Sequence, residues 1–164
     1  MKQRIMFFVL ALLIAGMFAS TGALAQDPEL MLPIELGDWF RDFFRSSEDA
    51  VEPFENLAYV YQDGNDNSSE QVQEGEDNRA YLYQNGDRNV ARQWQSGVGN
   101  WAGVYQLGNG NVAATHQAGT GNWAGIYQAG DANTAKIQQS GNNFSAGITQ
   151  IGNGNSAVIT QAKR

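Results

Sequence analysis

The side chains that could do chemistry in this 164-residue sequence are mainly carboxamides at regular spacing. A carboxamide carries hydrogen-bond donors and an acceptor, so identical amides stacked in register can bond to one another. Glutamine recurs with an unbroken period of 11, and a glycine follows two residues after each of the first nine glutamines. These residues are Gln62, Gln73, Gln84, Gln95, Gln106, Gln117, Gln128, Gln139, Gln150 and Gln161, with Gly64, Gly75, Gly86, Gly97, Gly108, Gly119, Gly130, Gly141 and Gly152.

Asparagine and alanine share the same period. Asparagine stands six residues before each glutamine, except at Phe144, and alanine stands four residues before it, except at Ser69. The repeating unit is therefore N-x-A-x-Φ-x-Q-x-G-x-x, and we expect its amides and glycines to mediate self-assembly. The asparagines are Asn56, Asn67, Asn78, Asn89, Asn100, Asn111, Asn122, Asn133 and Asn155.

Other kinds of chemistry lack candidate residues. His116 is the only histidine and cysteine is absent, so no metal site can be assembled around it, and we interpret it as a surface residue. The sequence offers neither a nucleophile beside a base nor a glycine-rich phosphate loop before a helix. We therefore predict no catalytic residue, no metal and no cofactor, and the protein is not expected to be an enzyme.

The elements that position the amides are predicted to be β-strands. An 11-residue period can also mark a right-handed helical supercoil, but glycine in every period, at about 1 kcal/mol each, would destabilise such a helix. A disordered Gln/Asn/Gly tract would not require a fixed register. Asparagine, alanine, Φ and glutamine fall at successive period-2 positions, which places them on one face of a strand.

The Φ position gives the larger period. Aliphatic residues occupy most units, whereas Gln71, Gln93 and Thr115 fall in alternate early units, so the structural period is 22. We predict an all-β, flattened parallel β-solenoid with amyloid-like cross-β stacking, in which each of five 22-residue rungs contributes two strands joined by glycine turns. The expected core residues are Val60, Leu82, Val104, Ile126, Ile137, Ile148 and Ile159.

Stacking at about 4.8 Å per rung places each residue over its counterpart 22 positions later. Asparagine and glutamine would then form amide ladders, and tyrosines from Tyr61 to Tyr127 would form an outer aromatic column, as would Trp101 and Trp123. Glu70 would lie one rung from Arg92.

The domain organisation follows from composition. Residues 1–25 are predicted to be a signal peptide, because an apolar run of about 14 residues is shorter than the about 20 that a membrane-spanning helix needs. Residues 26–55 form an acidic leader, and residues 56–164 form the repeat array. The expected rungs are 56–77, 78–99, 100–121, 122–143 and 144–164.

Net charge argues against a nucleic-acid partner. The formal charge of the whole chain is −7, and residues 26–57 carry nine acids against two bases. The leader is expected to be helical or disordered, with a short amphipathic helix over 37–45 capped by Asp38 and presenting Trp39, Phe40, Phe43 and Phe44. That helix is interpreted as a cap on the first rung, with a docking signal for a secretion pore or membrane as the alternative.

The repeat resembles the curlin repeat of bacterial curli subunits, as in residues 106–117, Q-L-G-N-G-N-V-A-A-T-H-Q. The resemblance covers 56–164 and implies an extracellular fibre on the cell surface, a pilus or fimbrium, used in biofilm matrix and cell adhesion. It also implies self-assembly, a second curlin-type subunit, periplasmic chaperones and secretion through an outer-membrane pore. The basic finish at Lys163 and Arg164 is similar to that of the minor, nucleating subunit, whereas the leader differs from the familiar one, so the subunit type stays open.

A second function stays open beside the fibre. A soluble, monomeric β-solenoid could bind a glycan through Trp101, Trp123 and the tyrosine column. An ice-binding face would need a regular threonine column, and Thr134, Thr149 and Thr160 do not provide one. The oligomeric state of the purified mature protein separates the two functions.

Overall fold

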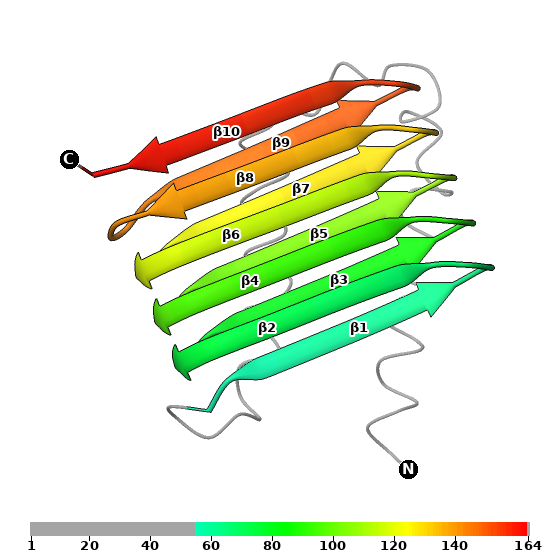
Figure 1. Cartoon of the computed structure of the whole chain (residues 1–164). Coiled ribbons are helices and arrows are strands. Elements are labelled where there is room, and N and C mark those ends of the chain that lie inside the picture. Colours follow the sequence, from blue (N-terminus) through cyan, green and yellow to red (C-terminus); the bar gives the residue numbers. More distant parts are fainter. Residues whose placement is uncertain (1–54, 164) are drawn as a thin grey trace, which may run out of the picture. The chain divides into compact units, whose positions relative to one another are not determined.

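The computed structural model describes residues 55–163, and the regular elements in this range are β-strands (Figure 1). No helix within the range is long and apolar enough to cross a membrane. The expected signal peptide, the acidic leader up to residue 54 and its short helix lie outside the described residues.

The strands are seven or nine residues long. In chain order they are β1 (Leu57–Asp63), β2 (Ser68–Glu76), β3 (Arg79–Asn85), β4 (Val90–Val98), β5 (Trp101–Leu107), β6 (Val112–Thr120), β7 (Trp123–Ala129), β8 (Thr134–Ser140), β9 (Ser145–Ile151) and β10 (Ser156–Ala162).

The strands form two five-stranded parallel sheets. One has the order β1-β3-β5-β7-β9 and the other β10-β8-β6-β4-β2, and the strands of one sheet run opposite to those of the other (Figure 1). Every pairing joins residues 22 apart, as in Gln84 with Gln106 and Gln95 with Gln117. The predicted parallel β-solenoid of five rungs with two strands per rung is therefore confirmed.

The core lies between the two sheets and is narrow. Alanine faces inward in nine strands and an aliphatic residue in seven, and Leu82, Val104, Ile126, Ile137 and Ile148 are all buried there. Gln71, Gln93 and Thr115 take the aliphatic position in β2, β4 and β6. Because alanine is small, the two sheets can approach closely, and their inward side chains pack together without leaving room between the sheets.

Two of the expected core residues depart from that prediction. Val60 is 43% exposed, and Ile159 is only half-buried. Both face inward in the first and last rungs, where no further rung covers one side of the residue. The aliphatic residues are thus buried from Leu82 in β3 to Ile148 in β9 and are more exposed in the first and last strands.

Two residues with positive φ stand where each strand leads into the next, and in β2, β4 and β6 the first of them is the penultimate residue of the strand. The nine glycines that follow glutamine have φ between 100° and 141°, a region that essentially only glycine occupies, as predicted. The residue two positions later also has positive φ, between 52° and 69°, and this second position was not predicted. It is occupied by Asp66, Asp77, Arg88, Gly99, Gly110, Gly121, Ala132, Asn143 and Gly154.

Aromatic side chains stack in register on the outside of the β1-β3-β5-β7-β9 sheet. Tyr83 and Tyr105 have ring centroids 4.5 Å apart, and the column extends to Tyr61 and Tyr127 at 4.9 and 5.4 Å. Trp101 and Trp123 stack at 5.1 Å, and each ring lies over the glycine two residues further along its strand. These columns were predicted from the sequence.

Candidate functional site: the amide ladders and the open ends of the array

Glutamine side chains form two continuous ladders between the sheets. In each, the Nε2 of one glutamine donates to the Oε1 of the glutamine 22 residues later, at distances of 2.6 to 2.9 Å. The ladder glutamines of the internal rungs are buried. One ladder joins Gln62, Gln84, Gln106, Gln128 and Gln150, and the other joins Gln73, Gln95, Gln117, Gln139 and Gln161.

The second amide proton of each internal glutamine crosses to the other sheet. Gln117 Nε2 donates to the backbone carbonyl of Trp101 at 2.9 Å, and Gln106 Nε2 donates to that of Val90 at 3.2 Å. Each buried amide therefore bonds along the array and across it, which satisfies its donors and ties the sheets together. Sequence reasoning missed this cross-sheet bond, because the repeat gives the column of a side chain but not the position of the opposite backbone.

Asparagine forms ladders of a different kind at the turns. Asn100 Nδ2 donates to the carbonyl of Gly119 at 2.9 Å, and its backbone N–H donates to Asn78 Oδ1 at 3.1 Å. Asn122 repeats both bonds one rung further on, to Gly141 and to Asn100. Asparagine thus fixes each turn to its neighbour, and the glycine carbonyl is part of the site.

The expected asparagines occupy these positions in the two turn columns, with donor bonds of 2.7 to 2.9 Å to glycine carbonyls for those that have a rung beyond them. The two columns hold Asn56, Asn78, Asn100 and Asn122 on one edge, and Asn67, Asn89, Asn111, Asn133 and Asn155 on the other.

The turn glycines allow backbones to stack at this spacing. A Cβ added to Gly108 would collide with the backbone carbonyl oxygen of Gly130, and one added to Gly97 would collide with that of Gly119. The glycine columns therefore supply two things at once, a positive φ and room for the next rung.

The two kinds of ladder have opposite polarity. In the bonds between amide side chains, glutamine donates to the glutamine of the C-terminal rung, as in Gln95 to Gln117, whereas asparagine donates to the asparagine of the N-terminal rung, as in Asn100 to Asn78. The array therefore has two chemically different ends, although its rungs are similar.

The open ends of the array hold the groups that internal rungs satisfy. Within residues 55–163, Gln150 and Gln161 each bond across to the other sheet but have no later glutamine to receive the second proton. Gln62 and Gln73 have acceptor oxygens that no earlier glutamine reaches. An inward-facing hydrophobic side chain is open there too, since Val60 is 43% exposed. The C-terminal end thus presents glutamine N–H donors, and the N-terminal end presents the glutamine oxygens that can accept from them.

One turn column changes at the C-terminal end. Phe144 stands where asparagine would be, so its backbone N–H still donates to Asn122 Oδ1 at 3.0 Å, but it has no amide to continue the column. Lys163 takes the place of the next glycine, and its backbone N–H donates to the carbonyl of Ser140 at 3.0 Å, as the turn glycines do. The last rung is therefore distinct from the four before it at one edge.

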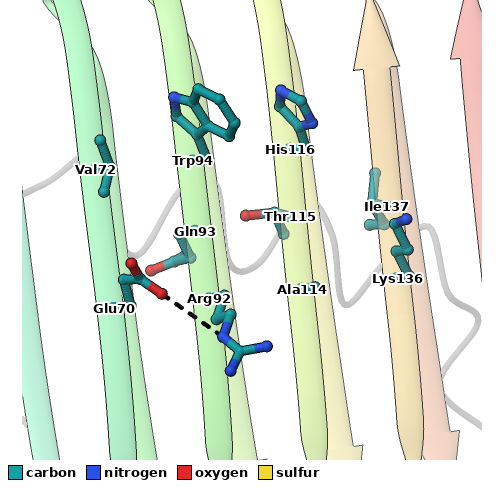
Figure 2. A pocket seen from close by; sticks show the side chains of 10 residues that line it. All are labelled: Glu70, Val72, Arg92, Gln93, Trp94, Ala114, Thr115, His116, Lys136 and Ile137. Carbon is teal, nitrogen blue, oxygen red and sulfur yellow. Dashed lines mark ion pairs between the residues drawn. The ribbon is translucent and has the colours of Figure 1, made fainter.

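A shallow groove runs over the outer face of the β10-β8-β6-β4-β2 sheet (Figure 2). Its floor is Ala114, between the cationic side chains of Arg92 and Lys136, and its rim includes Trp94 stacked on His116 at 4.7 Å. Glu70 and Arg92 form the expected ion pair at 3.6 Å, fully at the surface. His116 lies on the outer surface of β6, and the described residues contain no cluster of metal-ligating side chains.

Tyrosine is the titratable group whose pKa the fold changes. Burial raises the pKa of Tyr105 and Tyr127 above the ordinary value of 10.0, and for Tyr105 the neighbouring hydroxyls of Tyr83 and Tyr127 raise it further. Tyr105 and Tyr127 are therefore uncharged at neutral pH.

Comparison with known families gives one match. Residues 111–141 and 130–162 match the model of the curlin-associated repeat, and these segments span β6 to β10. No curated protein matches the chain significantly. The hydrogen-bonding pattern of the matched rungs extends without a break to β1 and β2, and in β2 Ser69 and Gln71 replace the usual alanine and aliphatic residue.

Proposed function

We propose that this chain, in which residues 111–141 and 130–162 match the curlin-associated repeat, is a secreted structural subunit that self-assembles into extracellular, curli-like amyloid fibres. In this function the ladder amides, the turn glycines and the aliphatic column are the assembly site. No chemistry beyond hydrogen bonding and burial is required of them.

The observation that carries the proposal is the complementarity of the two ends. If the 22-residue offset continues from one copy to the next, β9 receives β1 of the next copy and β10 receives its β2. Gln150 and Gln161 then donate to Gln62 and Gln73 of the next copy, and Asn155 Oδ1 accepts from the backbone N–H of its Asn67. The junction repeats the internal interface, apart from the edge that ends at Phe144.

Unpaired strand edges favour this addition. An open edge presents a row of N–H and C=O groups that another strand can pair with, and natural proteins usually protect such edges. Here both sheets have an open edge at each end of residues 55–163. Addition of a copy would also bury Val60, which in the internal rungs corresponds to Val104, 2% exposed.

The match to the curlin-associated repeat supports the cellular setting that we propose. The fibre would contribute to biofilm matrix and adhesion, after export through a curli-type outer-membrane pore with periplasmic chaperones, and beside a second curlin-type subunit. The chain would serve either as the bulk subunit or as the surface nucleator.

A seeded assembly experiment tests the proposal. Freshly denatured and desalted mature protein, residues 26–164, is expected to give a thioflavin signal after a lag, and sonicated fibres of the same protein should abolish that lag. Electron microscopy should then show fibres. A β-rich monomer that persists for days at micromolar concentration would contradict the proposal and favour the alternative of a soluble glycan-binding solenoid.

A further inference from the structure

Charge is distributed unequally between the two ends of the array. The first rung, residues 56–77, contains six acids and no Lys or Arg, whereas the last, residues 144–164, contains two bases and no Asp or Glu. The acids are Asp63, Asp66, Glu70, Glu74, Glu76 and Asp77, and the bases are Lys163 and Arg164.

Continuation of the observed register brings specific charges together. β10 pairs with β8, and β2 pairs with β4, in the same columns, so Ala162 would lie opposite Glu74 of the next copy. Lys163 follows Ala162 and keeps the backbone bond of a turn glycine, so it would lie opposite Gly75, with Glu74 and Glu76 of the next copy on either side.

These groups are available for a contact between copies. Glu74, Glu76 and Lys163 are exposed, and none of them takes part in an ion pair within residues 55–163. Their own columns are uncharged, since Glu74 neighbours Ser96 and Glu76 neighbours Val98. Asp77 and Glu70 differ, because they already pair with Arg79 and Arg92.

We propose that Lys163 at the C-terminal end of one copy and Glu74 and Glu76 at the N-terminal end of the next form an ionic contact that selects head-to-tail addition. This inference rests on the proposed fibre function. Head-to-head contact would place six acids over six acids, and tail-to-tail contact would place base over base, so both reversed arrangements are repelled.

The contact also compensates for a local defect. At this edge of the last rung, Phe144 supplies no side-chain acceptor for the backbone N–H of Asn56 of the next copy, and Lys163 replaces a glycine. The amide column is therefore interrupted where the charges meet. Attraction between exposed charges acts there in place of the missing hydrogen bond, and it is sensitive to salt.

A charge-exchange cycle on the mature protein tests the inference. Each variant elongates from its own sonicated fibres. At about 10 mM ionic strength, K163E and E74K should each elongate about three- to fivefold more slowly than the unaltered protein, and the difference should fall below about twofold at 0.5 M salt. The exchanged variant K163E/E74K should regain most of the rate.

The matched control is K136E. Lys136 lies on the outer face of β8 in the fourth rung, so the substitution makes the same change in net charge without touching an end. Its elongation rate should stay within about 1.5-fold of the unaltered protein. Equal slowing by K136E and K163E, or no recovery in K163E/E74K, would overturn the ionic contact while leaving the fibre proposal intact. Failure of the unaltered protein to form seedable fibres would overturn both.

Discussion

Gln138 and Gln139 are neighbours in β8 but face opposite sides of the sheet. Gln139 is 1% exposed; it accepts from Gln117 and donates to Gln161 and to the carbonyl of Trp123. We expect Q139A to lower the free energy of unfolding of the fibre by about 2–4 kcal/mol, because it leaves buried partners unsatisfied at about 1–3 kcal/mol each.

The control is Q138A, which makes the same change on the outer face and should cost less than about 0.5 kcal/mol. The measurement is the guanidinium midpoint for dissolution of preformed fibres. Similar midpoints for the two variants would show that the inward ladder contributes no more than a surface amide.

Gly108 and Gly110 form a second matched pair within one turn. Both have positive φ, at 103° and 66°, but a Cβ at Gly108 would collide with the backbone of Gly130, whereas a Cβ at Gly110 would meet nothing within 4 Å. G108A should therefore prevent stacking of the third rung on the fourth, and G110A should cost only about 1–2 kcal/mol.

Circular dichroism and seeded elongation of both glycine variants provide the measurement. Normal elongation of G108A would mean that the rungs are further apart than the structure places them.

The sequence predicted residue roles where one column repeats one amino acid. The glutamine, asparagine and glycine columns follow from identical residues at a fixed spacing, and the structure places them in columns. The second positive-φ position in each turn was missed because Asp66, Arg88 and Ala132 have no shared chemistry that marks it. The cross-sheet bonds of glutamine were missed because they depend on how two sheets face each other.

At the scale of elements, the tyrosine column makes the array sensitive to alkali. The pKa of Tyr105 and Tyr127 is raised by burial, so an unfolded tyrosine ionises near pH 10 while the folded one stays neutral. The stabilisation is fully present below pH about 10 and is lost as the pH rises toward the folded pKa.

Fibres should accordingly keep their β-sheet circular dichroism up to about pH 10 and lose it above that value. The variant Y105F/Y127F removes two of the ionising groups, so its loss of structure should move to higher pH. An unchanged pH midpoint in this variant would contradict a role for the buried tyrosines in the alkaline transition.

Strand pairing could be predicted from the sequence because a 22-residue offset matches identical or similar residues along the entire array. The lengths of the strands could not be predicted in this way. β2, β4 and β6 extend two residues beyond β8 and β10, into Gly75–Glu76, Gly97–Val98 and Gly119–Thr120, although glycine also follows β8 at the equivalent position. Backbone pairing at the turns decides these ends, and the repeat does not encode it in side chains.

At the scale of the whole molecule, similar rungs are combined with two different ends. Opposite ladder polarities, an acidic first rung and a basic last one make head-to-tail addition the arrangement that satisfies both hydrogen bonds and charge. The exposure of Val60 has the same origin, because a residue that packs inward needs a rung on each side. Sequence reasoning placed Val60 in the core because it assigned the aliphatic column as a whole, including its end rungs.

The register at the junction can be measured directly because the chain has no cysteine. Thr160 and Val72 belong to one outer column, and both are exposed. Within a single copy they lie four rungs apart, about 19 Å, which is too far for a disulfide, whereas across the junction they would be adjacent.

Fibres of V72C/T160C should therefore give a ladder of covalent multimers on mild oxidation, and fibres of V72C or T160C alone should stay monomeric on a non-reducing gel. Dimers from either single variant, or no ladder from the double variant in fibres that form normally, would contradict head-to-tail continuation of the 22-residue register.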